Sequence, residues 1–174
     1  MENKHDSNYH AHTYLCGHAS GIPLDYVKEA IKHNFKEIGM SEHAPMANLV
    51  NNNSRMDFKD YDLYLRLLND AKDLATKNNI KFYKGMEIEY FKNLDVYKKY
   101  LKDMDYLILG QHYIVKDNNY KSTYRLTSLE DVIIYKDMVS KLLIPDTLIY
   151  FVILIYVFLI SKTQVMKCMK RCVK

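Results

Sequence analysis

Between residues 8 and 143 the chain alternates short strand-like runs with longer helix-like runs. The short runs are apolar or alternate in polarity, whereas the longer runs repeat apolar residues at three- and four-residue spacing. Strands that alternate with helices predict βα units, and two parallel strands need such a crossover connection. We therefore predict an α/β fold with a mainly parallel sheet.

Seven segments carry this pattern. We expect strands from Tyr9 to His12 and at 36–43, 80–90 and 105–114, and helices at 24–35, 60–79 and 128–143. The residues expected on the buried helix faces are Val27, Ala30 and Ile31 in the first helix and Tyr64, Leu67, Ala71 and Leu74 in the second. The third opens with Ser128 and has Asp131 three residues later, which resembles a capping box.

Polar motifs follow four of the expected strands. HAH, SEH, EIE and GQH all fall at or just past the point where a strand should end. The carboxyl ends of parallel strands meet at one edge of an α/β sheet, and that edge is where functional groups gather. The four motifs together predict one site more strongly than any of them does alone.

Three histidines lie close to the start of the chain. His10 and His12 are spaced i, i+2, so on a strand they point to the same side and can bind one metal ion. A surface pair near a chain end is the alternative. His18 stands in a loop and is read as solvent-exposed unless a partner lies nearby, and Cys16 is expected to be a small buried thiol.

Later polar residues extend the set. Glu87 and Glu89 share one face of a strand, and a buried carboxylate is costly unless it is paired or binds a metal. We expect Glu87 to point inward and Glu89 to lie on a solvated outer face. His112 ends the most apolar strand and is expected to be functional, whereas His43 is either a ligand or a hydrogen-bonded histidine before Pro45.

Charge and cysteine usage limit the classes of partner. The net charge is +4, but residues 161–174 carry five basic and no acidic residues, which leaves 20 basic and 21 acidic residues in the body. A nearly neutral body argues against a nucleic-acid partner. The chain has three cysteines without a CxxC pair and an N-terminus without an apolar run, which fits a reduced, cytoplasmic protein.

Five segments together resemble a known family. NYHAHTYLCGHASG, KEIGMSEHAP, SRM, GMEIEY and DYLILGQHYI, in this order, are similar to the PHP (polymerase and histidinol phosphatase) superfamily and most closely to its monofunctional histidinol-phosphatase branch. The resemblance covers residues 8–143. It implies that the chain forms the N-terminal portion of a distorted (β/α)7 barrel, incomplete at the C-terminus.

The resemblance also implies a metal centre with up to three divalent ions, of zinc, manganese or iron. His10, His12 and Glu87 would bind the first ion, Glu87 would bridge to a second that also takes His112, and His18 and His43 would bind a third. Arg55 would hold the substrate's phosphate, because its fork matches phosphate oxygens.

The implied activity is hydrolysis of a small-molecule phosphomonoester, L-histidinol phosphate, in histidine biosynthesis. Water activated by the metals would be the nucleophile. No covalent phospho-enzyme is needed for this reaction. The sequence agrees, because it has no DxDx(T/V) nucleophile motif, no G-x-S-x-G nucleophile elbow and no glycine-rich P-loop. A nuclease-like or other PHP-type phosphoesterase is the alternative within the same class.

The resemblance stops near residue 143. Family members are longer, and the only segment here that resembles their later ligand motifs is Ile144-Pro145-Asp146. We therefore expect 8–143 to be a partial PHP domain and 144–174 to have no counterpart in the family. The uncharged run 147–160 is read as a membrane anchor, as buried strand residues, or as the product of a frameshift. A frameshift predicts an inactive remnant with incomplete metal sites. A membrane anchor predicts a membrane-tethered binding module.

Overall fold

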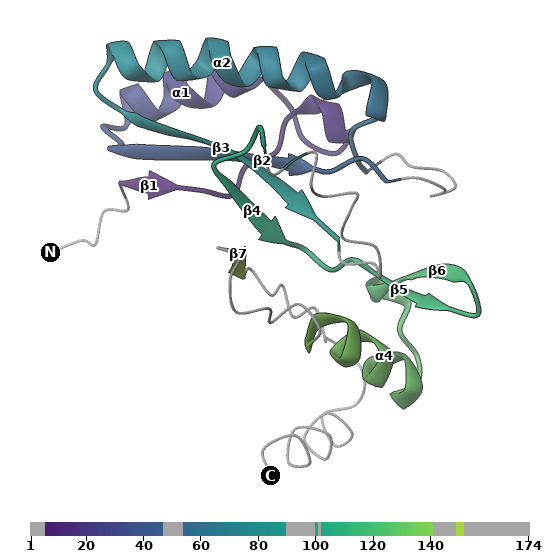
Figure 1. Ribbon diagram of the computed structural model, residues 1–174. Helices are drawn as coiled ribbons and strands as arrows, with labels where there is room; N and C mark the ends of the chain where they lie inside the picture. Colours follow the sequence, from purple (N-terminus) through teal and green to yellow (C-terminus); the bar gives the residue numbers. More distant parts are fainter. Residues whose placement is uncertain (1–5, 47–53, 90–99, 101, 141–148, 152–174) are drawn as a thin grey trace, which may run out of the picture. The chain divides into compact units, whose positions relative to one another are not determined.

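A computed structural model describes residues 6–46, 54–89, 100, 102–140 and 149–151 (Figure 1). These residues fall into two compact units, with 6–110 and 149–151 in the first and 111–140 in the second. The elements are β1 (Ser7–Asn8), η1 (Tyr14–Cys16), α1 (Pro23–Lys32), β2 (Glu37–His43), η2 (Phe58–Asp60), α2 (Tyr61–Lys77), β3 (Lys81–Ile88), β4 (Tyr106–Leu109), β5 (Tyr113–Lys116), β6 (Asn119–Ser122), η3 (Thr123–Arg125), α4 (Leu129–Ser140) and β7 (Ile149–Phe151).

The first unit is built on a five-stranded sheet in the order β1-β2-β3-β4-β7. All four strand pairs are parallel. α1 and α2 pack against each other and cover one face of the sheet (Figure 1). The predicted α/β class and parallel sheet are therefore confirmed.

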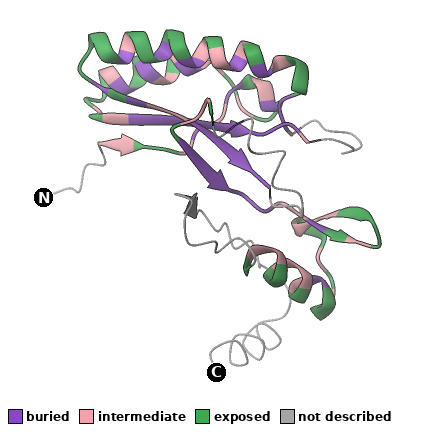
Figure 2. Ribbon diagram, viewed as in Figure 1, coloured by how far each residue is buried: buried purple, intermediate pink, exposed green. Residues whose placement is uncertain are grey.

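Most residues of the central strands are buried (Figure 2), and on one face of the sheet α1 and α2 provide the cover. Alternate residues of β2 and β3, among them Ile38, Met40 and Met86, belong to one core with Val27 of α1 and Tyr64 of α2. Ala30 is also buried in α1, so the predicted buried face of this helix is confirmed in its main positions.

The buried stripe of α2 agrees with the prediction in part. Tyr64 and Ala71 are buried as expected and Leu74 packs partly buried against the core, whereas the fully buried positions beside them are Leu68 and Ala75 rather than Leu67 and Leu74. Leucines occupy 63, 65, 67 and 68, so sequence spacing alone fits more than one stripe. Packing against the sheet selects the stripe that begins at Tyr61.

The expected strand from Tyr9 to His12 is wrong in its position, because β1 ends at Asn8. Beyond that point the chain still runs beside β2. The carbonyl of Ala11 accepts a hydrogen bond from the Ser41 amide at 2.9 Å, whereas the Ala11 amide donates to the Ser41 hydroxyl at 3.3 Å. A side chain thus replaces a backbone acceptor and the regular ladder is interrupted.

The second face of the sheet is organised by Tyr106 of β4. Its ring lies over Gly39 and Gly85, where a Cβ atom on either glycine would meet ring atoms. Its hydroxyl lies 2.5 Å from the carbonyl oxygen of Tyr9 and 3.2 Å from that of Met40. The absence of side chains at the two glycines lets one tyrosine reach across the sheet and fix the segment that follows β1.

The apolar run 147–160 lies largely outside the described residues. Its residues 149–151 form β7, which pairs with β4 through Leu107 and Ile149, so for these three residues the strand interpretation is correct. No helix in the described part of the chain is long and apolar enough to cross a membrane.

The second unit consists of the β5–β6 hairpin, η3 and α4. Asp117 and Asn118 form the hairpin turn with positive φ angles of 50° and 60°, as a type I′ turn requires. The capping box predicted at α4 is confirmed. The Ser128 amide donates to the Asp131 carboxylate and the Asp131 amide donates to the Ser128 hydroxyl, both at 3.1 Å.

Asp131 also joins the helix to the hairpin. Its buried carboxylate lies 2.7 Å from the Lys121 ammonium and 3.3 Å from that of Lys116, and it accepts the Thr127 amide at 3.0 Å. The ion pair with Lys121 and these backbone bonds hold the pKa of Asp131 well below its usual range, despite burial.

Asp131→Asn should therefore destabilise the second unit by about 2–3 kcal/mol, the cost of losing charged hydrogen bonds in a buried position. Because the pKa is lowered in the folded state, this stabilisation is complete above about pH 4 and is lost as the pH falls further. Hydrogen exchange of the α4 amides measures both effects. Asp137→Asn, an exposed change in the same helix, is the control and should leave exchange unchanged.

Candidate metal centre

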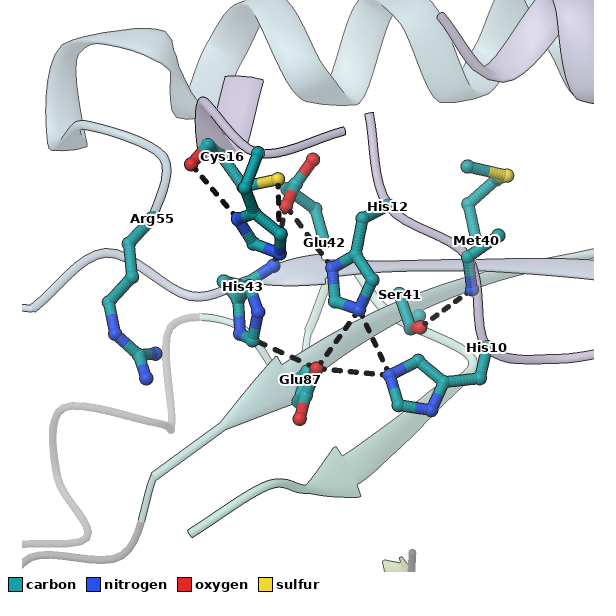
Figure 3. Close-up of polar contacts among 12 residues, drawn as sticks. His10, His12, Cys16, Met40, Ser41, Glu42, His43, Arg55 and Glu87 are labelled. Atoms are coloured by element: carbon teal, nitrogen blue, oxygen red, sulfur yellow. Dashed lines mark hydrogen bonds and ion pairs between the residues drawn. The ribbon is translucent and has the colours of Figure 1, made fainter. Parts of the chain in front are cut away.

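Five of the predicted ligands meet at the carboxyl edge of the first unit's sheet, and Figure 3 labels four of them: His10, His12, His43 and Glu87. They come from separate segments: His10 and His12 from the stretch after β1, His18 from the stretch after η1, His43 from the end of β2 and Glu87 from β3. The parallel register places His43 directly beside Glu87. The expectation that strand ends would bring these side chains together is thus met for the first unit.

Glu87 lies at the centre of the cluster and is buried. Its Oε2 atom is 3.0 Å from His10 Nε2 and 3.2 Å from His12 Nε2, and the two Nε2 atoms are 3.0 Å apart. The three donor atoms therefore form a nearly equilateral triangle. His10 and His12 point to the same side, although they are not part of a regular strand.

This donor set fits a divalent cation. Imidazole nitrogen and carboxylate oxygen bind zinc at about 2.0–2.2 Å, and three donors separated by 3.0–3.2 Å can all reach one ion at that distance. Without a cation to share, two imidazole nitrogens this close to each other would need a proton between them.

His43 and His18 continue the cluster. His43 Nδ1 is 3.4 Å from Glu87 Oε2, and the His43 ring stacks on the His12 ring with centroids 4.4 Å apart. His18 is exposed, as predicted, but its ring lies 5.2 Å from that of His43, so this loop histidine has a neighbour in the cluster. Cys16 is buried, as predicted, with its Sγ atom 3.8 Å from His18 Nε2.

The sequence reasoning did not single out Glu42, yet its carboxylate is fully buried beside the cluster. Oε1 lies 3.4 Å from His12 Nδ1 and accepts the His43 amide at 2.8 Å. Oε2 accepts the amide and the hydroxyl of Thr13, at 2.8 and 2.6 Å. One signal could have found it: Glu42 alternates with Ile38 and Met40, so it occupies a position where β2 otherwise carries apolar residues.

Two buried carboxylates give this site a preference for positive charge. Burial by itself would lower the pKa of His12, but hydrogen bonds and charge interactions with Glu42 and Glu87 outweigh it and raise the pKa to about 9. Burial would raise the pKa of Glu42, yet the bonds from His12, Thr13 and the His43 amide lower it. The negative charges of Glu42 and Glu87 therefore favour the binding of a cation between His12 and Glu87.

The expected solvated position of Glu89 is wrong, because this carboxylate is buried and forms an ion pair with the buried Arg55. Glu89 follows β3 directly and is two residues beyond Glu87. Its burial requires a partner charge, which the guanidinium provides. Arg55, predicted to bind phosphate, is thereby held at the carboxyl end of β3.

His112 belongs to the second unit, where its carbonyl accepts a hydrogen bond from the Thr123 amide at 2.8 Å. In the sequence it follows β4 by three residues. Its predicted role as a ligand of the same centre stays a prediction.

Comparison with known proteins finds relatives that are named as histidinol-phosphatases or probable histidinol-phosphatases. The histidinol-phosphatase of Bacillus subtilis is 28% identical over 125 residues, which are 64% of this chain and 45% of that protein. The chain thus spans about half the length of the curated relatives that it matches. These names agree with the histidinol-phosphatase branch that the motifs indicate.

Two crystal structures share the fold. One, from Listeria monocytogenes, has a TM-score of 0.58 at 21% identity and covers 72% of this chain and 51% of its own. The other is a histidinol phosphate phosphatase from Lactococcus lactis in complex with zinc, L-histidinol and phosphate, with a TM-score of 0.55 at 20% identity, covering 79% of this chain and 54% of its own.

The sequence itself matches the PHP domain family over residues 8–146. This range includes all five clustered side chains, Glu42, Arg55 and His112, and it ends close to the boundary expected near residue 143. Because the match covers most of the chain, the protein belongs to the PHP domain family.

Proposed function

We propose that the protein is a metal-dependent phosphomonoester hydrolase and that its substrate is L-histidinol phosphate. The observation that carries this proposal is the triangle of donor atoms from His10, His12 and Glu87, with sides of 3.0–3.2 Å. Family membership and the names of the relatives support the reaction and the substrate.

In this proposal His10, His12 and Glu87 hold one divalent cation. His18 and His43 contribute to a further site, and His112 joins Glu87 in another. A bound cation would supply Lewis-acid stabilisation of the phosphoryl oxygens and would lower the pKa of water. Zinc, manganese and iron all suit imidazole and carboxylate donors.

The chain's own side chains would position the substrate. Arg55 presents a planar fork that matches phosphate oxygens, and its ion pair with Glu89 holds it at the sheet edge that carries Glu87. Thr13 and Glu42 keep the His12 segment in place through buried hydrogen bonds. Such positioning is a large part of catalysis of phosphoryl transfer to water. Cysteine usage makes the cytoplasm the expected location.

The test is phosphate release from L-histidinol phosphate by the purified chain with Mn²⁺ or Zn²⁺, beside His12→Ala. We expect turnover that needs added metal, disappears with a chelator and is lost in the variant. Folded, metal-loaded protein without turnover would contradict the proposal. Equal turnover of unrelated phosphomonoesters would contradict the substrate and leave the reaction class intact.

A further inference from the structure

Glu42 contacts the candidate ligands from the side opposite to Glu87. His12 Nε2 faces Glu87 Oε2 at 3.2 Å, whereas His12 Nδ1 faces Glu42 Oε1 at 3.4 Å. The same Oε1 atom accepts the His43 amide at 2.8 Å. One carboxylate thus touches the ring of one candidate ligand and the backbone of another, and these belong to segments about thirty residues apart in sequence.

A carboxylate at position 42 is unfavourable if the stability of the fold is the only consideration. Its side chain is fully buried and lies in the register of β2 that otherwise packs against the helices through Ile38 and Met40. A buried carboxylate costs free energy unless hydrogen bonds compensate it, and an apolar residue at this position would avoid the cost. The contacts with His12 and His43 supply a reason for the charge that packing does not.

An imidazole binds a metal through one nitrogen, and the proton on the other nitrogen decides which one is available. A carboxylate that accepts from Nδ1–H fixes the ring orientation and directs Nε2 outward as a lone-pair donor. For His12 the nitrogen directed at the donor triangle is Nε2, and the nitrogen engaged by Glu42 is Nδ1. Within the described residues the hydrogen-bond contacts of the His10 ring all involve its Nε2 atom, so the His10 ring is a reference for a histidine without a carboxylate at Nδ1.

We infer that Glu42 is a positioning residue of the metal centre: it accepts a hydrogen bond from His12 Nδ1 and thereby fixes the His12 tautomer, while it holds the His43 backbone in register. This inference rests on the proposed metal centre but does not require that the bound metal support hydrolysis. The role inferred for Glu42 acts through the ligand histidines and requires no direct contact with substrate or metal.

The experiment compares the zinc affinity of the wild type, Glu42→Gln and Tyr61→Phe, by competition with a chromophoric chelator. Glu42→Gln should weaken zinc binding about 10- to 100-fold, the range found when an outer partner of a metal-binding histidine is removed. Tyr61→Phe removes a buried hydroxyl that bonds Asp103 at 3.0 Å and serves as the matched control for a general loss of stability. It should bind zinc as the wild type does.

A second measurement does not depend on whether Glu42→Gln folds. In zinc-loaded wild-type protein with ¹⁵N-labelled histidine, NMR should show His12 protonated at Nδ1, with a proton that exchanges more slowly than the ring proton of His10. Unchanged zinc affinity in a folded Glu42→Gln variant, or a His12 without a proton on Nδ1, would overturn the inference.

These outcomes are separate from those of the proposed function. Tight zinc binding without phosphate release would overturn the proposed hydrolase and still leave Glu42 under test. Phosphate release by the wild type together with unchanged zinc affinity in Glu42→Gln would support the proposed hydrolase and overturn the positioning role of Glu42.

Discussion

Glu87→Gln should abolish metal-dependent phosphate release, with a loss of about 10³-fold or more in kcat. The variant keeps the shape of the side chain but replaces the carboxylate that three imidazoles surround, at 3.0 Å from His10, 3.2 Å from His12 and 3.4 Å from His43. The neutral amide cannot balance a divalent cation, and its nitrogen would face a histidine nitrogen. Zinc affinity should fall together with turnover.

Isothermal titration with Zn²⁺ and a phosphate-release assay measure the two effects on the same preparation. Glu29→Gln is the matched control, because this exposed glutamate of α1 forms its ion pairs, among the described residues, with Lys32 and His33 on the helix surface. It should retain wild-type affinity and turnover. A Glu87→Gln variant that binds zinc as tightly as the control would show that the centre does not depend on this carboxylate.

Gly85→Ala should destabilise the protein by about 3 kcal/mol or more, which is a large fraction of the stability of an ordinary domain. A Cβ atom at this position would lie closer than 3.0 Å to carbons of the Tyr106 ring, a separation that folded proteins do not tolerate. Neither the ring nor the strand can move easily, because the Tyr106 hydroxyl is bonded to the carbonyl oxygens of Tyr9 and Met40. Urea denaturation measures the change.

A double-mutant cycle with Tyr106→Leu isolates the clash. Once the ring is gone, adding the Gly85→Ala methyl should cost much less than in the wild type, and the two changes should be strongly non-additive. Gly21→Ala provides the contrast: its φ angle is +77°, but the nearest atom to an added Cβ lies at 3.5 Å, so only about 1 kcal/mol of backbone strain is expected. Additive effects at Gly85 and Tyr106 would contradict this account of the close approach.

Periodicity predicts the regular elements of the first unit well, because their pattern is local. The ranges of α1, β2 and β3 agree with the expected segments to within a few residues. The strand expected from Tyr9 to His12 fails for a non-local reason, since the Ser41 hydroxyl on another strand takes the place of a backbone acceptor. The division of the chain after Gly110 has no sequence signal in composition or linker residues.

The residues of the candidate site also divide into those that local sequence patterns predict and those that depend on non-local packing. Motif spacing and the rule that strand ends share an edge suffice to bring His10, His12, His43 and Glu87 together. His18 joined the expected set only through the resemblance to the family, because its loop position gives no such signal. The roles of Glu42 and Glu89 depend on what lies above or beside the strand, so they could not be predicted from spacing. A charged residue in an apolar register, as at position 42, is the clue that most directly signals such a role.

The reach of Tyr106 across the sheet has a consequence for the order of folding. Its hydroxyl fixes the carbonyl of Tyr9, the residue before His10, across a sequence separation of 97 residues. Contacts of such separation form slowly, because a long loop must close first. We therefore expect His10 and His12 to gain their fixed positions only after β4 has joined the sheet, so that competence for metal binding arises late in folding.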